Sequence, residues 1–108
     1  MTSEPSKDVR RSTRIAVSRG IWVSWRVDGP SNVSRVRDLS LGGVFILTTT
    51  AVPPGTEVQM LFALPEGEMR LQGTVRYGEA EKGFGVEFVK VGTADGARLR
   101  ELLRRISR

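Results

Sequence analysis

Apolar and polar residues alternate with a period of two over much of this chain. In the first such run, residues 21–27, apolar side chains at odd positions alternate with Trp22, Ser24 and Arg26. Because successive side chains of a strand point to opposite faces of a sheet, this run predicts a strand with one buried face. Trp22 and Trp25 fall on opposite faces, so we expect at most one of them to lie fully in the core. We expect the other to be partly buried beneath the N-terminal arm or the C-terminal helix described below, and the alternative is that it stacks on a base or a partner.

Five further runs rich in apolar residues follow, and Gly or Pro residues separate them. They predict strands at about residues 33–39, 44–48, 57–64, 69–77 and 83–89, with a loop around Gly78. Six short strands at this spacing are typical of a meander or barrel, and closure into a ring removes the exposed edges of an open sheet. The pattern therefore predicts an all-β fold, a six-stranded antiparallel β-barrel.

The hydrophobic period changes near the C-terminus. Arginines there separate four apolar residues that fall at i, i+3, i+4 and i+7. These are Leu99, Leu102, Leu103 and Ile106. This spacing predicts an amphipathic helix from about Thr93 to Ser107. We expect Thr93 or Asp95 to serve as its start, and its apolar stripe to seal one open end of the barrel.

The N-terminal segment shows no hydrophobic period. Residues 1–9 are polar and are expected to form a flexible tail. The basic run at residues 10–14 follows as a loop or arm. The predicted organisation is one domain over residues 10–108, in which the arm precedes a barrel at about 15–91 and a helix at about 93–107.

Length and composition limit the possible classes of protein. The 108 residues, 39% of them hydrophobic, can build one modest core, which fits a single domain. No apolar run approaches the ~18 residues needed to span a bilayer, and the N-terminus lacks the apolar stretch of a signal peptide. We therefore expect a cytoplasmic protein with no membrane span.

Two residue types are missing from the chain. The absence of Cys removes disulfides and thiolate chemistry, and the absence of His removes the commonest general base and metal ligand. The sequence contains no Gly-x-Ser-x-Gly or Gly-x-x-x-x-Gly-Lys motif, and no carboxylate pair stands out. We therefore expect neither an enzyme nor a metal or cofactor site.

The net charge of +5 is distributed unevenly. Residues 1–27 carry six basic and two acidic side chains, residues 94–108 carry five and two, and the middle of the chain is net acidic. Both ends are therefore able to attract an anion such as a nucleotide, a nucleic acid or an acidic protein.

Arg10 and Arg14 lie four residues apart in an arm that does not look helical. A guanidinium group donates bidentately to phosphate oxygens and to the O6/N7 edge of guanine, and its plane stacks on bases. The two arginines can therefore converge on a nucleotide. The alternative is that they belong to a solvated basic tail.

Residues 38–43, Asp-Leu-Ser-Leu-Gly-Gly, offer complementary groups. A carboxylate accepts hydrogen bonds from N1–H and the N2 amino group of guanine, a hydroxyl can meet an amino group or a phosphate, and glycines let backbone N–H groups approach a ligand. The adjacent Gly42 and Gly43 also permit positive φ, so the chain can bend sharply here. The alternative is a tight β-turn in which Asp38 and Ser40 bond to local backbone.

Together, the two elements resemble the signature of the PilZ family. Arg-x-x-x-Arg at residues 10–14 is followed, after 23 intervening residues, by the family's Asp/Asn-x-Ser-x-x-Gly at residues 38–43. Residues 42–46, 53–56, 71–75 and 83–88 also look like later strands of this family, so the likeness extends from about residue 9 to residue 107. The resemblance implies a six-stranded antiparallel barrel with a C-terminal helix and a cyclic di-GMP site on its outer surface.

The resemblance also implies which residues bind the ligand. The implied site consists of Arg10, Arg11 and Arg14 on the arm and Asp38, Ser40, Gly42 and Gly43 on the barrel. By analogy with the family, Arg10 and Arg14 grip guanine edges and phosphates, with Arg11 as a helper on phosphate. The aspartate and the serine meet a guanine, and the second glycine holds the turn. Val9 supplies no further cation, so the number of bound ligands, one or a stacked pair, stays open.

A mechanism follows from the two locations. Because we expect the arm to be mobile and the barrel rigid, a ligand that touches both would order the arm and pass a signal to a downstream protein. One alternative is a PilZ-like adaptor that binds proteins but no nucleotide, although the intact signature argues against it. Another is a basic nucleic-acid-binding barrel, against which the 6% aromatic content and the acidic middle of the chain weigh.

Overall fold

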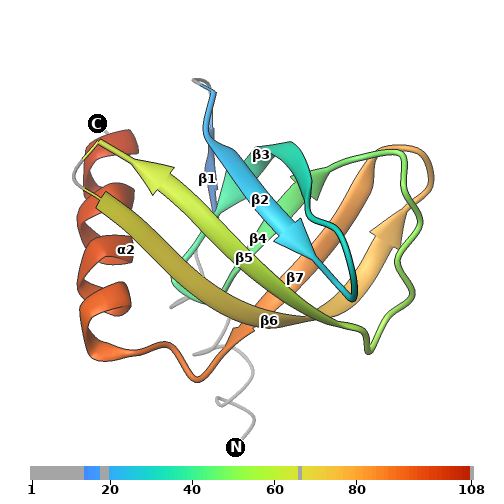
Figure 1. The fold of residues 1–108 in the computed structure, drawn as a ribbon. Coiled ribbons are helices and arrows are strands. Elements are labelled where there is room, and N and C mark those ends of the chain that lie inside the picture. Colours follow the sequence, from blue (N-terminus) through green and yellow to red (C-terminus); the bar gives the residue numbers. More distant parts are fainter. Residues whose placement is uncertain (1–13, 18–19, 66, 108) are drawn as a thin grey trace, which may run out of the picture.

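The computed structural model describes residues 14–17, 20–65 and 67–107. Its elements are β1 (Ile15–Ala16), β2 (Trp22–Arg26), β3 (Asn32–Leu39), β4 (Gly43–Leu47), β5 (Glu57–Leu64), β6 (Gly67–Glu79), β7 (Gly83–Val89) and α2 (Thr93–Ile106) (Figure 1). Strands β2 to β7 are the six expected from the sequence. The short strand β1 was not expected, and the predicted tail, Arg10 and Arg11 lie outside the described residues.

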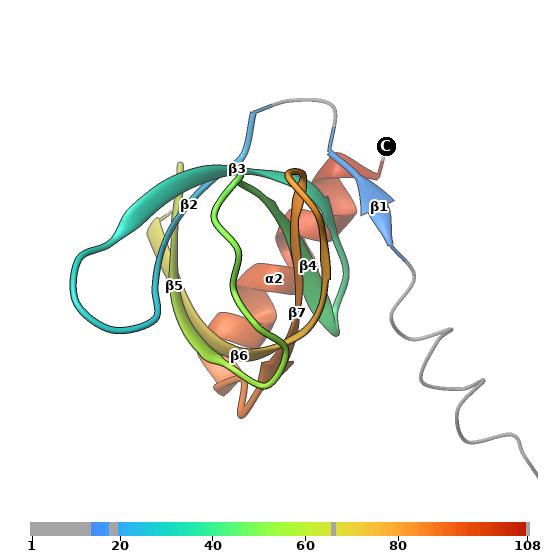
Figure 2. The ribbon, with the colours of Figure 1, turned by 90° about the vertical axis from the view of Figure 1, so that its right-hand side faces the viewer.

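The six longer strands form a closed antiparallel ring. Hydrogen-bonded neighbours follow the order β3-β2-β5-β6-β7-β4, and β4 pairs again with β3. Figure 2 shows the ring in a view along the barrel, with α2 behind it. This confirms the predicted six-stranded barrel with a C-terminal helix. β1 pairs with the end of β3, beyond the residues that pair with β2.

Strand β6 is longer than the sequence pattern indicated. It continues to Glu79, which pairs with Gly83 of β7, and the connection is closed by a hydrogen bond from Lys82 N–H to the carbonyl of Glu79 at 2.9 Å. The expected loop around Gly78 is therefore wrong. Gly78 can stay in the strand because its backbone still pairs with Phe84 of β7.

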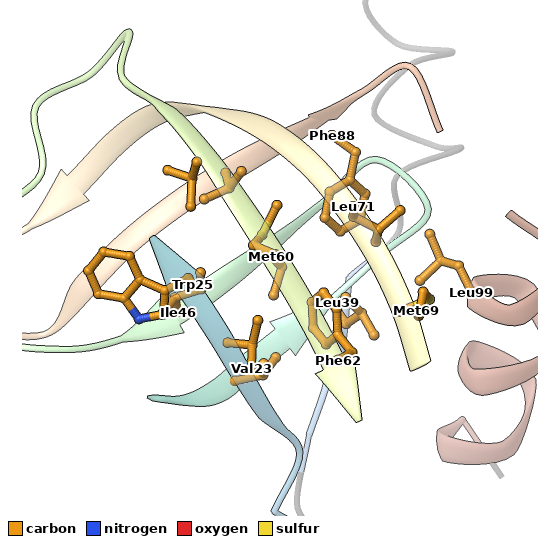
Figure 3. Packing of buried hydrophobic residues seen from close by; sticks show 14 of the residues in the cluster. Val23, Trp25, Leu39, Ile46, Met60, Phe62, Met69, Leu71, Phe88 and Leu99 are labelled. Carbon is orange, nitrogen blue, oxygen red and sulfur yellow. The ribbon is translucent and has the colours of Figure 1, made fainter. Parts of the chain in front are cut away.

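The inward side chains of all six strands form one hydrophobic core, to which α2 adds Leu99, Leu102 and Leu103 (Figure 3). Trp25 is only 2% exposed, meets Phe84 edge to face at 5.1 Å between ring centroids, and donates from its indole N–H to Ser34 Oγ at 2.9 Å. The buried indole therefore has both an aromatic neighbour and a hydrogen-bond partner.

Trp22 lies on the opposite face of β2, as the alternation predicted, and it is 53% exposed. The group that lies over its ring is the guanidinium of Arg35, whose Cζ is 5.9 Å from the ring centroid. Arg35 is the residue that faces Trp22 across the β2–β3 ladder. The contact is therefore a cross-strand pair on the outer surface of the barrel.

Helix α2 lies across one end of the barrel, as Figure 1 shows. This placement agrees with the predicted apolar stripe. The helix begins at Thr93, one of the two expected starts, and the residue before it, Gly92, occupies the cap position without a side-chain hydrogen bond. Asp95 instead accepts a hydrogen bond from the backbone N–H of Arg70 at 3.1 Å, which ties the first turn to β6.

Within the described parts of the chain, no helix combines the length and the apolar character that crossing a membrane requires.

Candidate functional site

A β-bulge in β3 sets the direction of two charged side chains on the outer surface. The ladder between β3 and β4 shifts register between Val36 and Asp38, so Arg37 is an extra residue without a partner on β4. Val36 and Leu39 both belong to the core. Strict alternation would turn only one of the two residues between them outward, whereas the bulge lets both Arg37 and Asp38 face outward.

Strand β1 brings the end of the arm to this point. Ala16 pairs with Asp38, and Val17 N–H donates to the carbonyl of Arg37 at 2.9 Å. Arg14, two residues before Ala16, donates from Nη1 to Asp38 Oδ1 at 2.5 Å. The two halves of the signature, 24 positions apart in sequence, therefore meet through their side chains. At Arg14 this differs from the expected free arm, because the arginine is already bound to the barrel.

Arg37 holds the other oxygen of the same carboxylate. Its Nε donates to Asp38 Oδ2 at 3.0 Å, its Nη1 donates to Glu79 Oε1 at 3.2 Å, and its guanidinium carbon lies 3.7 Å from the centroid of the Phe45 ring. The hydrogen bond to Asp38 raises the pKa of Arg37 above its ordinary value, burial opposes this to a smaller extent, and the bond to Glu79 adds to the rise. Arg37 therefore stays charged in any physiological medium.

Phe45 belongs to the outer face although it is fully buried. Its neighbours in β4 are core residues, so alternation points its ring away from the core. The ring is covered by Arg37 on one side and by Tyr77, with ring centroids 5.9 Å apart, on another. A second bulge, between Val75 and Tyr77 of β6, turns Tyr77 to the same outer face as Phe45, and Tyr77 pairs there with Gly85 of β7. This outer aromatic pair thus lies directly beside the charged cluster, which consists of Arg14, Arg37, Asp38 and Glu79.

The turn after β3 is fixed by Ser40, which is only 1% exposed. Its Oγ accepts hydrogen bonds from the N–H groups of Gly42 and Gly43 at 3.1 and 3.0 Å, and it donates to the carbonyl of Gly43 at 3.3 Å. The Ser40 hydroxyl therefore bonds to local backbone, as in the β-turn alternative. Asp38 does not follow that alternative, because its carboxylate pairs with two arginines.

Gly43 is required by a close contact. Gly42 and Gly43 do not use the positive φ that glycine permits, because positive φ among the described glycines occurs only at four other positions. A Cβ on Gly43 would instead lie 2.2 Å from the carbonyl oxygen of Val86. The glycine lets β4 pair closely with β7. Gly42 contributes its carbonyl, which accepts a hydrogen bond from Phe88 N–H at 2.8 Å.

Sequence reasoning missed four residues of this surface: Arg37, Glu79, Phe45 and Tyr77. Arg37 stands directly before the signature aspartate, and its place in the outward series with Arg35 was a usable signal. Glu79 is 42 positions away from Arg37, and no local pattern connects them. Arg10 and Arg11 lie outside the described residues.

The resulting site can recognise a ligand that offers N–H donors to a carboxylate and anionic oxygens to guanidinium groups. Guanine nucleotides combine both features. In the described part of the chain, no group of three or more acidic side chains is placed to hold a metal ion.

Comparison with protein families matches the PilZ domain over residues 8–105. This chain belongs to the PilZ family. The match covers both signature elements, the whole barrel and nearly all of α2, so the resemblance seen in the sequence is confirmed. A search of curated protein sequences found no match.

Several solved structures share the fold at low sequence identity. The PilZ domain of YcgR from Escherichia coli, solved with c-di-GMP, is 18% identical with a TM-score of 0.71, and the match covers 91% of each chain. The complex of K. pneumonia MrkH with c-di-GMP is 17% identical with a TM-score of 0.74, covering 91% of this chain and 52% of that one. Bacillus subtilis MotI/DgrA, an inhibitor of motility, is 18% identical with a TM-score of 0.71, covering 89% and 50%. The chain thus spans about half the length of the last two proteins.

Proposed function

We propose that this PilZ domain is a receptor for cyclic di-GMP, with Asp38 accepting hydrogen bonds from a guanine edge. The observation that carries the proposal is the pairing of Arg14 with Asp38, which joins the two signature elements at one point on the outer surface. The ligands in the YcgR and MrkH structures support the choice of nucleotide.

The other signature residues complete the proposed site. Arg14 turns from Asp38 toward a phosphate or guanine of the ligand, and Arg10 and Arg11 supply further guanidinium groups from the arm. Ser40 and the two glycines contribute by holding the turn, since the serine hydroxyl is satisfied by backbone groups. The proposed domain comprises residues 10–108.

We assign this receptor no enzymatic role and place it in the cytoplasm, where it signals to a downstream protein. Because Arg14 is already attached to β3, the ordering caused by the ligand concerns the part of the arm that precedes it. Hydrogen exchange measures this directly. Cyclic di-GMP should slow amide exchange at residues 10–13, and unchanged exchange there would contradict arm ordering while leaving ligand binding intact.

The test of the receptor function is calorimetric titration of the full chain with cyclic di-GMP, with GTP and single-stranded DNA as controls. Saturable binding of the dinucleotide alone is the expected result. Arg14→Ala should weaken it about 10- to 100-fold, because hydrogen bonds to charged groups contribute about 1.5–3 kcal/mol. Arg70→Ala is the matched control, since Arg70 is also an exposed arginine in an ion pair, with Glu68.

The other outcomes are equally informative. If no titrant binds, the receptor proposal is wrong and the protein-adaptor alternative gains support. DNA binding that falls steeply with salt would indicate a nucleic-acid-binding barrel instead. Equal affinities of the Arg14 and Arg70 variants would show that the ligand binds elsewhere.

A further inference from the structure

Both oxygens of the Asp38 carboxylate are occupied by arginines of the chain itself. Arg14 Nη1 donates to Oδ1, and Arg37 Nε donates to Oδ2 at 3.0 Å. Two N–H donors on two carboxylate oxygens reproduce the pattern in which N1–H and the N2 amino group of guanine bind a carboxylate. Only 13% of the Asp38 side chain is exposed, so there is little room for further donors beside the two guanidinium groups.

Arg14 and Arg37 differ in the partners that are available to them once their bonds to Asp38 are broken. Arg14 belongs to the signature and gains new partners on the ligand under the proposed function. Arg37 stands outside the signature, and its second carboxylate partner, Glu79, belongs to the protein. The guanidinium carbon of Arg37 also lies 3.7 Å from the centroid of the Phe45 ring. Arg37 therefore keeps a carboxylate and a ring contact of the protein when its bond to Asp38 is broken.

We propose, on the basis of the function proposed above, that Arg37 sets the affinity for guanine by closing Asp38, and that guanine binding breaks this contact and leaves Arg37 on Glu79 alone. Arg37 competes with the exocyclic amino group of guanine for Asp38 Oδ2. Glu79 favours the open state because it remains a carboxylate partner of the guanidinium after Asp38 has been taken by guanine. Arg37 and Glu79 thus determine specificity and affinity without belonging to the family signature.

Calorimetric titration of the full chain with cyclic di-GMP tests this role through two substitutions with opposite expected signs. Arg37→Met keeps an apolar side chain over Phe45 and frees Asp38, so affinity should rise about threefold relative to the control variant, the scale of an exposed ion pair. Glu79→Gln leaves Arg37 without any carboxylate partner once guanine has taken Asp38, so affinity should fall about two- to threefold. Charge alone predicts the reverse for both, because the ligand is an anion.

The matched control is Arg35→Met. Arg35 lies two residues along β3 on the same outer face, contacts Trp22, and makes no ion pair with any residue that the structure describes. It reports the general cost of losing one positive charge. The double variant Arg37→Met/Glu79→Gln should bind like Arg37→Met, because Glu79 acts only through Arg37. Thermal melts of each variant identify any that do not fold, and Glu79→Gln tests the proposal independently because Glu79 does not cover Phe45.

Cyclic di-IMP gives a readout that a merely structural role would not change. Hypoxanthine lacks the exocyclic amino group and needs only one carboxylate oxygen, which Arg14 vacates. Arg37→Met should therefore improve binding of cyclic di-GMP and leave that of cyclic di-IMP unchanged relative to Arg35→Met.

Three results would overturn the proposal: the same gain in affinity for both ligands, no change in affinity in either variant, or tighter binding of cyclic di-GMP by Glu79→Gln. If the unaltered chain binds no cyclic di-GMP, the receptor function fails as well, whereas normal binding with the wrong signs refutes only the role of Arg37.

Discussion

The rings of Phe45 and Tyr77 lie on the outer face of the barrel with their centroids 5.9 Å apart, above the position where Gly85 carries no side chain. A Cβ on Gly85 would fall 2.4 Å from the Tyr77 ring. Two β-bulges, one in β3 and one in β6, border this pair. The bulge in β3 turns Arg37 and Asp38 outward together, and the bulge in β6 turns Tyr77 outward beside Phe45.

Removal of the Tyr77 ring should destabilise the fold. Tyr77→Ala uncovers Phe45, and we expect the free energy of unfolding to fall by about 1–3 kcal/mol, more than the ~0.5–1.5 kcal/mol of an aromatic pair because apolar surface is exposed as well. Tyr77→Phe keeps the ring and should change stability little. Urea unfolding of both variants measures the difference. Equal stability of the two would show that Tyr77 does not cover Phe45.

Gly43 should not tolerate a side chain. Gly43→Ala places a Cβ against the backbone oxygen of Val86, and the strands must separate to admit it. We expect a loss of about 1–3 kcal/mol, the scale of overpacking, measured by chemical denaturation. Gly78→Ala is the control, because its Cβ would meet nothing nearer than 3.8 Å. An unaffected Gly43→Ala protein would contradict the tight β4–β7 contact.

Loss of the Ser40 hydroxyl should lower the stability of the fold more than it lowers the affinity for the ligand. Ser40→Ala leaves two N–H groups of the turn without their acceptor, which costs about 1–3 kcal/mol. Thermal melting without ligand detects this loss, and Ser31→Ala in an exposed loop is the comparison. A Ser40→Ala protein of normal stability but much weaker affinity would instead indicate direct contact with guanine.

The two tryptophans should be distinguishable by fluorescence. Trp22→Phe leaves only the buried Trp25, whose emission should be blue-shifted and protected from iodide quenching. Trp25→Phe leaves the exposed Trp22, which should be red-shifted and readily quenched. It also removes the indole donor from Ser34, so this variant should be less stable by about 0.5–1.5 kcal/mol. Similar quenching of the two variants would contradict the assignment of faces.

Much of the fold could be predicted because its signals are local. The alternation in β2 and the 3.6-residue period of α2 depend on side chains a few positions apart, and both elements lie within one residue of their expected bounds. The partner of Asp95 in the first turn of α2 was not predictable in the same way. Asp95 bonds to Arg70, and only the packing of the helix against β6 brings these two residues together.

The candidate site was only partly predictable. The signature identified Asp38 and Arg14, and the structure brings them into contact. Strict alternation could not reveal that Arg37 and Asp38 share the outer face. The bulge that places them there is a feature of the pairing between β3 and β4, which the sequence of β3 alone does not show. The contact of Arg37 with Glu79 likewise depends on the closure of the ring.

The sequence by itself determined the number of barrel strands, the terminal helix and the family, since each follows from periodicity or from motifs along the chain. Only the tertiary structure decided what surrounds Asp38. Its partners are Arg14 from the arm and Arg37 from its own strand, and Glu79 of β6 holds the second arginine. The physical reason is that ion pairs form between groups that are close in space, and strand pairing, bulges and closure of the barrel set those distances.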